Sequence, residues 1–140
     1  MMLKQTLKCF VLLNLFFSSL VLAQQSTTAQ PAIDAAKVWL AEGDAGNYAA
    51  TWSKSATVFQ SSINVQKWSE LLKTHRAPLG KVKTRTLKSA QETTTLPGAP
   101  EGNYVVIQFD TVFENQTTVE TVTPMKEKDG SWKVSGYFIK

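Results

Sequence analysis

The stretch that decides the fold is Tyr104–Phe113, which reads YVVIQFDTVF. Alternate residues of a β-strand point to opposite faces of the sheet, so this stretch divides into two sets. The more apolar set predicts the core face and consists of Val105, Ile107, Phe109, Thr111 and Phe113; the mixed set predicts the outer face and consists of Tyr104, Val106, Gln108, Asp110 and Val112. We expect the first face to pack on helices and the second to be available to a partner or a second copy.

Period-two patterns and turn-forming residues surround this strand. We expect three further strands, at residues 82–93, 117–126 and 132–139. The connections are expected at the Pro- and Gly-rich residues 96–102, at residues 114–116 and at Asp129-Gly130. Pro124 indicates an edge or a bulge in the third of these four strands. The second half of the chain therefore predicts a four-stranded antiparallel meander.

The residues before Gly80 follow helical spacing. Three short helices are expected: over residues 32–42, over a second segment with the apolar positions Ala45, Tyr48, Ala49 and Trp52, and from a cap at Asn64 to a stop before Pro78. Helices followed by a run of strands predict an α+β domain.

The sequence also predicts how the helices end and what connects them. Gly43 is expected to end the first helix, and Asp44 to cap the second. Residues 54–63 are expected to be irregular, with Val58 and Phe59 tucked against the core.

The order of the elements favours one architecture over another. Three short N-terminal helices packed on a curved four-stranded meander are typical of the cone of the nuclear-transport-factor-2-like (NTF2-like) fold, and a cystatin-like wrap is the alternative. Residues 24–31 predict a flexible tether, and residues 32–140 a single domain with one core.

The first 23 residues predict a secretory signal peptide. Lys4 and Lys8 precede an apolar run, Cys9–Leu22, that is shorter than the roughly 20 residues of a membrane-spanning helix. Small residues then lead to polar ones at Ala23-Gln24, where we expect cleavage. The short signal and simple chain favour a bacterial protein that is soluble and either periplasmic or secreted.

Charge and cysteine content exclude several classes of protein. The chain has 15 Lys and Arg residues, two of them in the signal, and 11 Asp and Glu residues, so the mature net charge is about +2 and gives little reason to expect nucleic-acid binding. Its one cysteine, Cys9, lies in the signal, so no disulfide or thiol chemistry is expected. The one histidine, His75, is interpreted as a helix-end residue, and no metal or cofactor is expected.

A pocket between the helices and the sheet would have aromatic walls. The candidate ligand-binding residues are Trp39, Tyr48, Trp52, Trp68, Phe109 and Trp132, which are also the residues that a plain core would use. Asp110 and Tyr104 resemble the acid and phenol of a cone-shaped isomerase, but the alternation places both outside, where a surface pair is expected. No catalytic residue is therefore predicted.

A basic stretch without acidic residues lies between Glu70 and Glu92. Within it, Lys81, Lys83 and Arg85 alternate and are expected to project from one face of a strand. One interpretation is a contact surface for a polyanion of the cell envelope. The favoured alternative is an edge strand protected by lysines against sheet-to-sheet aggregation.

Several segments together resemble one protein family. The segments are Arg76–Gly80, Arg85–Ala90, Leu96–Pro100, Gly102–Phe109, Glu120–Thr123 and Asp129–Tyr137, with Trp39-Leu40, Asp44–Tyr48 and Trp68 in the helical half. They are similar to the bacterial secreted domain of unknown function four-zero-one-nine, and the resemblance covers nearly the whole mature chain. It implies a small periplasmic or secreted domain with no assigned reaction and no catalytic residue to carry over.

Three functions are consistent with these patterns. A non-catalytic binding or protein-interaction domain is favoured, because no set of titratable residues converges. The alternatives are a small enzyme or ligand carrier that uses a cavity between helices and sheet, and an envelope polyanion binder that uses the basic strand. The expected partner is an envelope protein or a small ligand, and a homodimer through the outer sheet face is a further option; neither nucleic acid nor a membrane span is expected.

Overall fold

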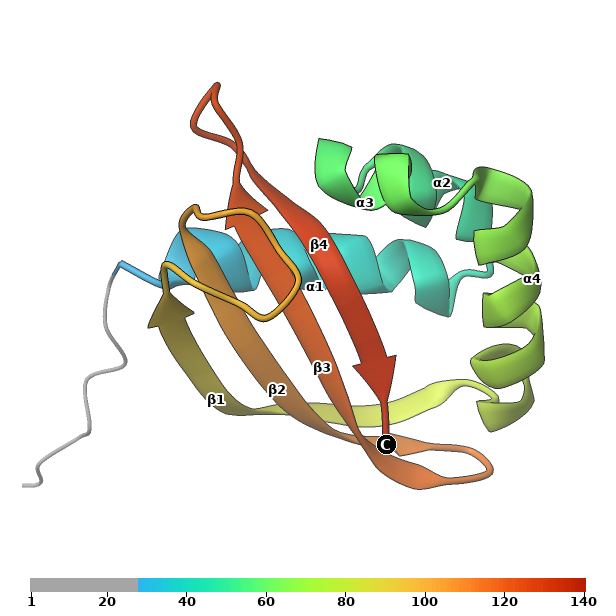
Figure 1. The fold of residues 1–140 in the computed structure, drawn as a ribbon. Coiled ribbons are helices and arrows are strands. Elements are labelled where there is room, and N and C mark those ends of the chain that lie inside the picture. Colours follow the sequence, from blue (N-terminus) through green and yellow to red (C-terminus); the bar gives the residue numbers. More distant parts are fainter. Residues whose placement is uncertain (1–27) are drawn as a thin grey trace, which may run out of the picture.

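In the computed structural model, which describes residues 28–140, four α-helices and a 3-10 turn precede four strands (Figure 1). The helical elements are α1 (Gln30–Asp44), α2 (Tyr48–Ser53), α3 (Thr57–Ser62), α4 (Val65–His75) and the 3-10 turn η1 (Ala77–Leu79). The strands are β1 (Val82–Thr93), β2 (Tyr104–Phe113), β3 (Thr117–Lys126) and β4 (Trp132–Ile139). The predicted α+β class is confirmed. The predicted signal peptide, its cleavage site and tether residues 24–27 lie outside the described residues.

The strands form one antiparallel sheet in the order β1-β2-β3-β4, as the meander pattern predicts. All four lie at their predicted residues. The register of β3 against β4 shifts between Thr123 and Pro124, which confirms the predicted irregularity at this proline. The turn before β4 uses Gly130 at a φ of 84°, a left-handed conformation that glycine adopts without steric cost.

Helix α1 covers the inner face of the sheet and packs against β2, β3 and β4, whereas α4 lies to one side, beyond β4 in the view of Figure 1. The buried side chains of α1 recur at helical spacing and are Ala32, Ile33, Ala36, Trp39 and Leu40. They meet the inward residues of β2, since Val105, Ile107 and Phe109 are almost completely inaccessible to solvent. The predicted core face of β2 is therefore confirmed.

Helix α1 is longer than predicted at both ends. It begins at Gln30, with Pro31 in its first turn, so the end of the predicted tether belongs to the domain. It continues through Gly43 to Asp44, and Gly46, two residues further on, has a φ of 79°. The amide N–H groups of Gly46 and Asn47 donate to the carbonyls of Gly43 and Glu42, the pattern of a Schellman stop. The prediction that Gly43 ends the helix was wrong because the left-handed residue that closes the motif is Gly46.

Residues 54–63 are not irregular as predicted, because Thr57–Ser62 form α3. Six residues are too few for a helical period to be recognised in the sequence. The side-chain amide of Gln60 donates to the carbonyls of Trp52, Ser53 and Ser55, which ties α3 to the end of α2. Phe59 packs edge-on against Trp68 at 4.8 Å, so it joins the core as predicted.

Three tryptophans hold the helices together, both by hydrogen bonds from their ring N–H groups and by the apolar surface that their rings bury. The indole N–H of Trp39 donates to the carbonyl of Thr51 at 2.8 Å and lies 3.0 Å from the Ser55 hydroxyl. Trp68 donates to the Thr51 hydroxyl, and Trp52 to the carbonyl of Ile63. Buried indoles with satisfied N–H groups specify one arrangement of the helices.

Candidate functional site

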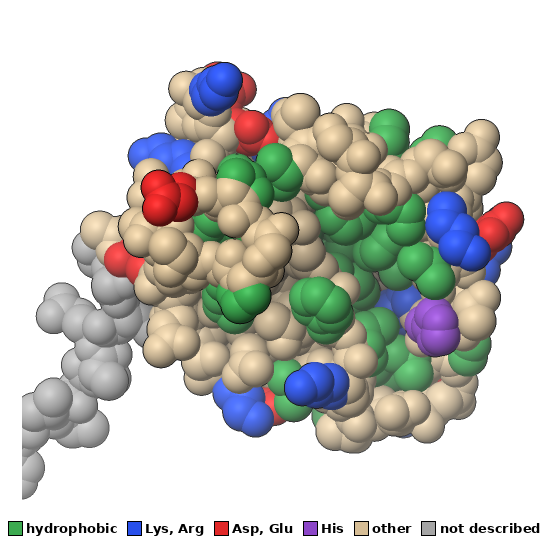
Figure 2. Space-filling view, viewed as in Figure 1, with side chains coloured by type: hydrophobic (Ala, Val, Ile, Leu, Met, Phe, Trp, Pro, Cys, Tyr) green, Lys and Arg blue, Asp and Glu red, His purple; other side chains and the backbone are tan. Residues whose placement is uncertain are grey.

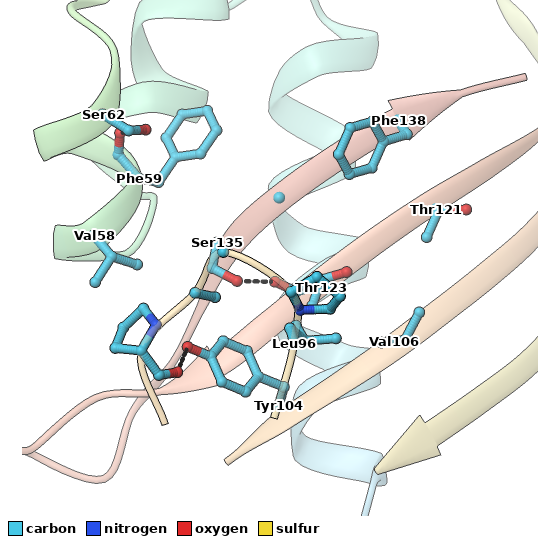
Figure 3. Close-up of a pocket in the computed structure, with 15 residues that line it drawn as sticks. Val58, Phe59, Ser62, Leu96, Tyr104, Val106, Thr121, Thr123, Ser135 and Phe138 are labelled. Atoms are coloured by element: carbon cyan, nitrogen blue, oxygen red, sulfur yellow. Dashed lines mark hydrogen bonds between the residues drawn. The ribbon is translucent and has the colours of Figure 1, made fainter. Parts of the chain in front are cut away.

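A groove lined mainly by apolar residues crosses the outer face of the sheet (Figure 3). Its volume is about 440 Å³. Strands β2, β3 and β4 form the floor, α3 forms one wall, and the loop between β1 and β2 forms the other. The lining side chains that carry the argument are Val58, Phe59, Leu96, Tyr104, Val106 and Phe138. Such a groove has the size of a site for a small ligand or a few side chains of a partner.

The loop wall is held over the sheet by Tyr104. The Tyr104 hydroxyl donates to the carbonyl of Pro100 at 2.6 Å, and the ring is only 1% exposed although it lies on the outer face. Tyr104 forms a second apolar cluster with Ala56 and Met125, against which Leu96 and Val58 pack. The outer face is therefore not a plain solvent face, because the Pro- and Gly-rich loop folds back onto it.

The groove is free of charge, since none of its fifteen lining residues among residues 28–140 is acidic or basic. Its polar groups are hydroxyls and backbone; for example, the Ser135 hydroxyl donates to the carbonyl of Thr123 at 2.8 Å. At one end lies Phe138, a large apolar residue that is 67% exposed. An uncharged groove with an exposed aromatic rim favours uncharged, apolar ligands.

A second cluster, of charged and polar side chains, lies inside the domain between the helices and the sheet. Glu120 of β3 is 0% exposed. Its Oε1 accepts from Arg85 Nε at 2.8 Å and from the Thr111 hydroxyl at 2.6 Å, and its Oε2 accepts from the Tyr137 hydroxyl. Both carboxylate oxygens therefore have partners, as a buried charge requires.

Arg85 connects this carboxylate to Asp44 at the end of α1, and Arg76 makes a second contact with Asp44. Arg85 donates from both terminal nitrogens to Asp44, at 2.6 and 3.0 Å, in a two-pronged contact. Arg76 donates to Asp44 at 3.1 Å and to the carbonyl of Gly80 at 2.8 Å, and it lies 4.4 Å from the ring centre of Phe113. We call Asp44, Arg76, Arg85, Glu120 and Tyr137 the interior network. Its two acids balance its two arginines, and it joins the end of α1 to the sheet.

The environment of the network shifts three of its pKa values. Burial alone would raise the pKa of Asp44, but the hydrogen bonds and charges of Arg85 and Arg76 outweigh it and hold that pKa below its ordinary value. Burial alone would lower the pKa of Arg85, but Asp44 and Glu120 hold it above the ordinary value. Burial and then the charge of Glu120 raise the pKa of Tyr137. These shifts favour the charged forms of Asp44 and Arg85 and the neutral form of the Tyr137 phenol.

The space next to the interior network is too small for a substrate. The cavity bounded by Trp39, Leu72, Arg76 and Tyr137 has a volume of about 10 Å³. That is room for about one water molecule. The acid and phenol of the network, Glu120 and Tyr137, are thus in contact with each other, and this cavity is too small to admit an organic molecule.

The six aromatic residues predicted as pocket walls belong to the main core. Trp39, Trp68 and Phe109 are buried in it, and Tyr48, Trp52 and Trp132 pack partly buried against it. The groove of the outer face shares none of these six residues. It was missed because its loop wall comes from a segment whose sequence indicates only a turn.

The predicted outer pair of Asp110 and Tyr104 does not form. The Tyr104 hydroxyl is bound to Pro100, and exposed Asp110 lies 3.4 Å from Lys88 instead. The acid and phenol that do meet are Glu120 and Tyr137, on the inner face. A sequence signal for this pair existed, because Glu120 alternates with Val122 and so occupies an inward position of β3.

Lys81, Lys83 and Arg85 do not share one strand face as expected. The register of β1 against β2 shifts between Val82 and Thr84, so Lys83 is an extra residue in a bulge. The extra residue turns Arg85 inward, where its side chain is 14% exposed and paired with two carboxylates. Lys81 and Lys83 are exposed, so the alternation was wrong because a bulge exchanges the two faces.

Asp44 also differs from its predicted role. It is the last residue of α1, and its carboxylate binds arginines instead of capping α2. In the third predicted helix, by contrast, the Asn64 side chain accepts from the backbone N–H of Lys67 at 2.8 Å, and the predicted cap of α4 is confirmed.

Two properties of the described residues bear on metal binding and on membrane insertion. Across residues 28–140, no group of three or more His, Cys, Asp or Glu side chains is placed to hold a metal ion. In the same part of the chain, no helix has both the length and the apolar character needed to cross a bilayer. His75 is exposed at the end of α4, as its interpretation as a helix-end residue requires.

The chain belongs to the family described as "Protein of unknown function (DUF4019)", whose family model matches residues 35–137. The resemblance noted in the sequence is therefore confirmed, and the match spans both the helical layer and the sheet. Searches of the curated proteins and of the solved structures found no match.

The interior network predicts loss of stability at both extremes of pH. The lowered pKa of Asp44 stabilises the fold above the ordinary value of 3.8, and this contribution is lost as the pH falls through the lower value of the folded state. The raised pKa of Tyr137 stabilises the fold below pH 10.0, and this contribution is lost as the pH rises above that value. Chemical unfolding monitored by tryptophan fluorescence across the pH range measures how the free energy of unfolding falls in acid and in alkali.

Two variants test which residue causes the loss of stability in acid and which causes the loss in alkali. Asp44→Asn should remove part of the decline in acid, and Tyr137→Phe part of the decline in alkali, each with lower stability at neutral pH because a partner is lost. Parallel alkaline limbs for the wild type and Tyr137→Phe would show that Tyr137 is not the titrating group.

Proposed function

We propose that this protein is an exported, non-catalytic binding domain whose outer groove takes an uncharged, mainly apolar ligand. The observation that carries the proposal is the groove itself: about 440 Å³ of apolar and hydroxyl-lined space without a charged side chain. Its walls are built by α3 and by a loop that Tyr104 holds in place, so the groove exists before any ligand binds.

The proposed export follows from the N-terminal sequence. Lys4 and Lys8, the apolar run of residues 9–22 and the small residues before Gln24 are the features that a secretion signal needs. We also propose that the domain is a filled variant of the NTF2-like cone, since α1 lies along the inner face of a curved meander (Figure 1). In such a variant the interior supports the fold and binding moves to the outside.

A binding role is favoured over catalysis by where the reactive groups lie. Glu120 and Tyr137, the acid and phenol that contact each other, are held in the interior network beside a cavity of about 10 Å³. The only polar groups that the outer groove offers a ligand are hydroxyls and backbone, and no titratable pair converges on it. The geometry thus supports retention of a ligand more than its conversion.

The test uses a variant that fills the groove and leaves the fold intact. A Cβ at Gly136, on the groove floor, would meet the Phe138 ring at 3.8 Å and the Thr123 Cβ at 4.0 Å, which are ordinary contacts. Gly136→Val should therefore fold, because valine suits a strand, and should weaken binding of the neutral fluorescent probe N-phenyl-1-naphthylamine by about tenfold or more. Fluorescence titration of the protein purified from a periplasmic extract measures this, and its mass shows whether the chain begins at Gln24.

The matched control is Thr86→Val, which adds the same side chain to the outer face of β1, away from the groove lining. It should bind the probe as the wild type does. Equal probe binding by the wild type and Gly136→Val would contradict the proposal. A dimer in sedimentation equilibrium that excludes the probe would instead assign the outer face to a second copy of the chain.

A further inference from the structure

Strand β4 lies at one edge of the sheet and pairs only with β3. Lys140 and Val119 exchange both of their backbone hydrogen bonds, at 3.0 and 3.1 Å, so the backbone of Lys140 faces β3. Backbone groups alternate along an antiparallel strand, and Phe138 therefore also faces β3. The N–H and C=O groups of Tyr137 and Ile139 then point away from the sheet.

These outward groups are open, whereas the beginning of the same edge is covered. The N–H of Ala56, which precedes α3, donates to the carbonyl of Val134 at 2.8 Å and closes the edge there. Beyond that point, the backbone groups of Tyr137 and Ile139 point away from β3, and among residues 28–140 no group outside the sheet bonds to them. An unpaired edge of this kind is a template for another extended chain.

Apolar surface lies on both sides of the open edge. On the inner side, Figure 2 shows hydrophobic side chains exposed in the space between β4 and α4. The flanking elements carry the half-buried residues Leu71, Tyr137 and Ile139. On the outer side stands Phe138, which lines the groove. A chain added at this edge would therefore find apolar contacts for the side chains of both its faces.

The charges near the edge decide what kind of chain fits. Residues 131–140 contain two lysines, Lys133 and Lys140, and no acidic residue. The lysines lie on either side of the open positions Tyr137 and Ile139. A second copy paired through β4 would bring four lysines together without an acid, which is unfavourable for facing strands. Acidic residues on the incoming chain would complement them.

We propose that the partner is an extended peptide segment, apolar in its centre and acidic at its ends, which adds to β4 as a fifth strand. Its backbone pairs with Tyr137 and Ile139, and its outward side chains reach the groove past Phe138. The inference rests on the proposed binding function, because it names the ligand class of the same face, but it places the decisive contacts at the strand edge and not on the groove floor.

The test compares peptides that differ only in their backbone. The probe is a capped peptide, Asp-Thr-Val-Thr-Val-Thr-Val-Asp, with two versions N-methylated on alternate residues, so that each version blocks one of its two edges. We expect one methylated version to bind like the parent and the other about tenfold or more weakly by isothermal titration. In hydrogen exchange, the parent should protect the amides of Tyr137 and Ile139.

Two protein variants separate this inference from the proposed function. Ile139→Pro removes an N–H that points away from β3, so it should abolish peptide binding and leave binding of N-phenyl-1-naphthylamine unchanged. Gly136→Val should weaken the naphthylamine more than the peptide. If Ile139→Pro fails to fold, the methylated peptides still decide the question on the wild type.

Specific results would overturn the inference. Equal binding of both methylated peptides, loss of binding by both, or unprotected amides at Tyr137 and Ile139 would exclude strand addition at this edge. A β4-dependent dimer in sedimentation equilibrium would assign the edge to a second copy. If the naphthylamine binds as proposed while the peptide fails, the groove function stands and the strand partner does not.

Discussion

Replacing Arg85 with methionine is expected to lower the free energy of unfolding by about 3–5 kcal/mol. Arg85 bridges the fully buried Glu120 and Asp44, whose side chain is 27% exposed, and methionine fills similar space without charge or donors. The substitution would leave a buried carboxylate with only the Thr111 and Tyr137 hydroxyls as donors. Urea unfolding followed by tryptophan fluorescence measures the loss, which is large because an uncompensated buried charge costs more than the ion pair contributes.

Lys83→Met is the matched control on the same strand. Lys83 is exposed and lies in the bulge, so its loss should change stability by no more than about 0.5 kcal/mol. Adding Glu120→Gln to Arg85→Met should recover part of the loss, because it removes the charge left without its arginine. If Arg85→Met and Lys83→Met proved equally mild, the interior network would not hold the helices to the sheet.

Trp39→Ala is expected to destabilise the domain by about 3–5 kcal/mol. The ring is buried between Trp68 and Tyr137, at centroid distances of 6.3 and 5.1 Å. Truncation would leave a cavity at the centre of the core and would also remove the donor for the Thr51 carbonyl. The midpoint of urea unfolding should fall markedly, with a smaller change in its slope.

Val38→Ala serves as the control, because Val38 is the neighbour of Trp39 on α1 and is 62% exposed. Its truncation should be within about 0.5 kcal/mol of the wild type. A Trp39→Ala variant that retained wild-type stability would mean that the core collapses around the missing ring, and that the helical layer is less specified than its hydrogen bonds indicate.

Local pattern predicted the strands well, and the reason is visible in β2. Its two faces differ in composition, and turn-forming residues bound it on both sides, so local chemistry and tertiary burial agree. For the same reason, the sequence also predicted β3, β4 and the bulge at Pro124. Helix ends were less predictable, since Gly43 and Gly46 are both plausible stops and only the hydrogen-bond pattern selects Gly46.

The buried position of Glu120 in the interior network could be predicted from the sequence. Glu120 sits at an inward position of β3 by plain alternation, and a buried acid calls for a cationic partner. Its partner Arg85 could not be predicted, because simple alternation places Arg85 on the outer face and a single bulge at Lys83 turns it inward. One extra residue was enough to move Arg85 from the expected outer face into interior ion pairs, while Lys81 and Lys83 stayed exposed.

The sequence by itself determined the α+β class, the meander and its core face, because each rests on the period of a continuous segment and on nearby turn residues. The tertiary structure alone decided that Arg85 turns inward, that Tyr104 holds a loop over the outer face, and that β4 keeps an open edge. These features join residues far apart in the chain, or depend on a one-residue shift in register. Periodicity carries no information about either, so the groove and the edge emerge only once the chain is folded.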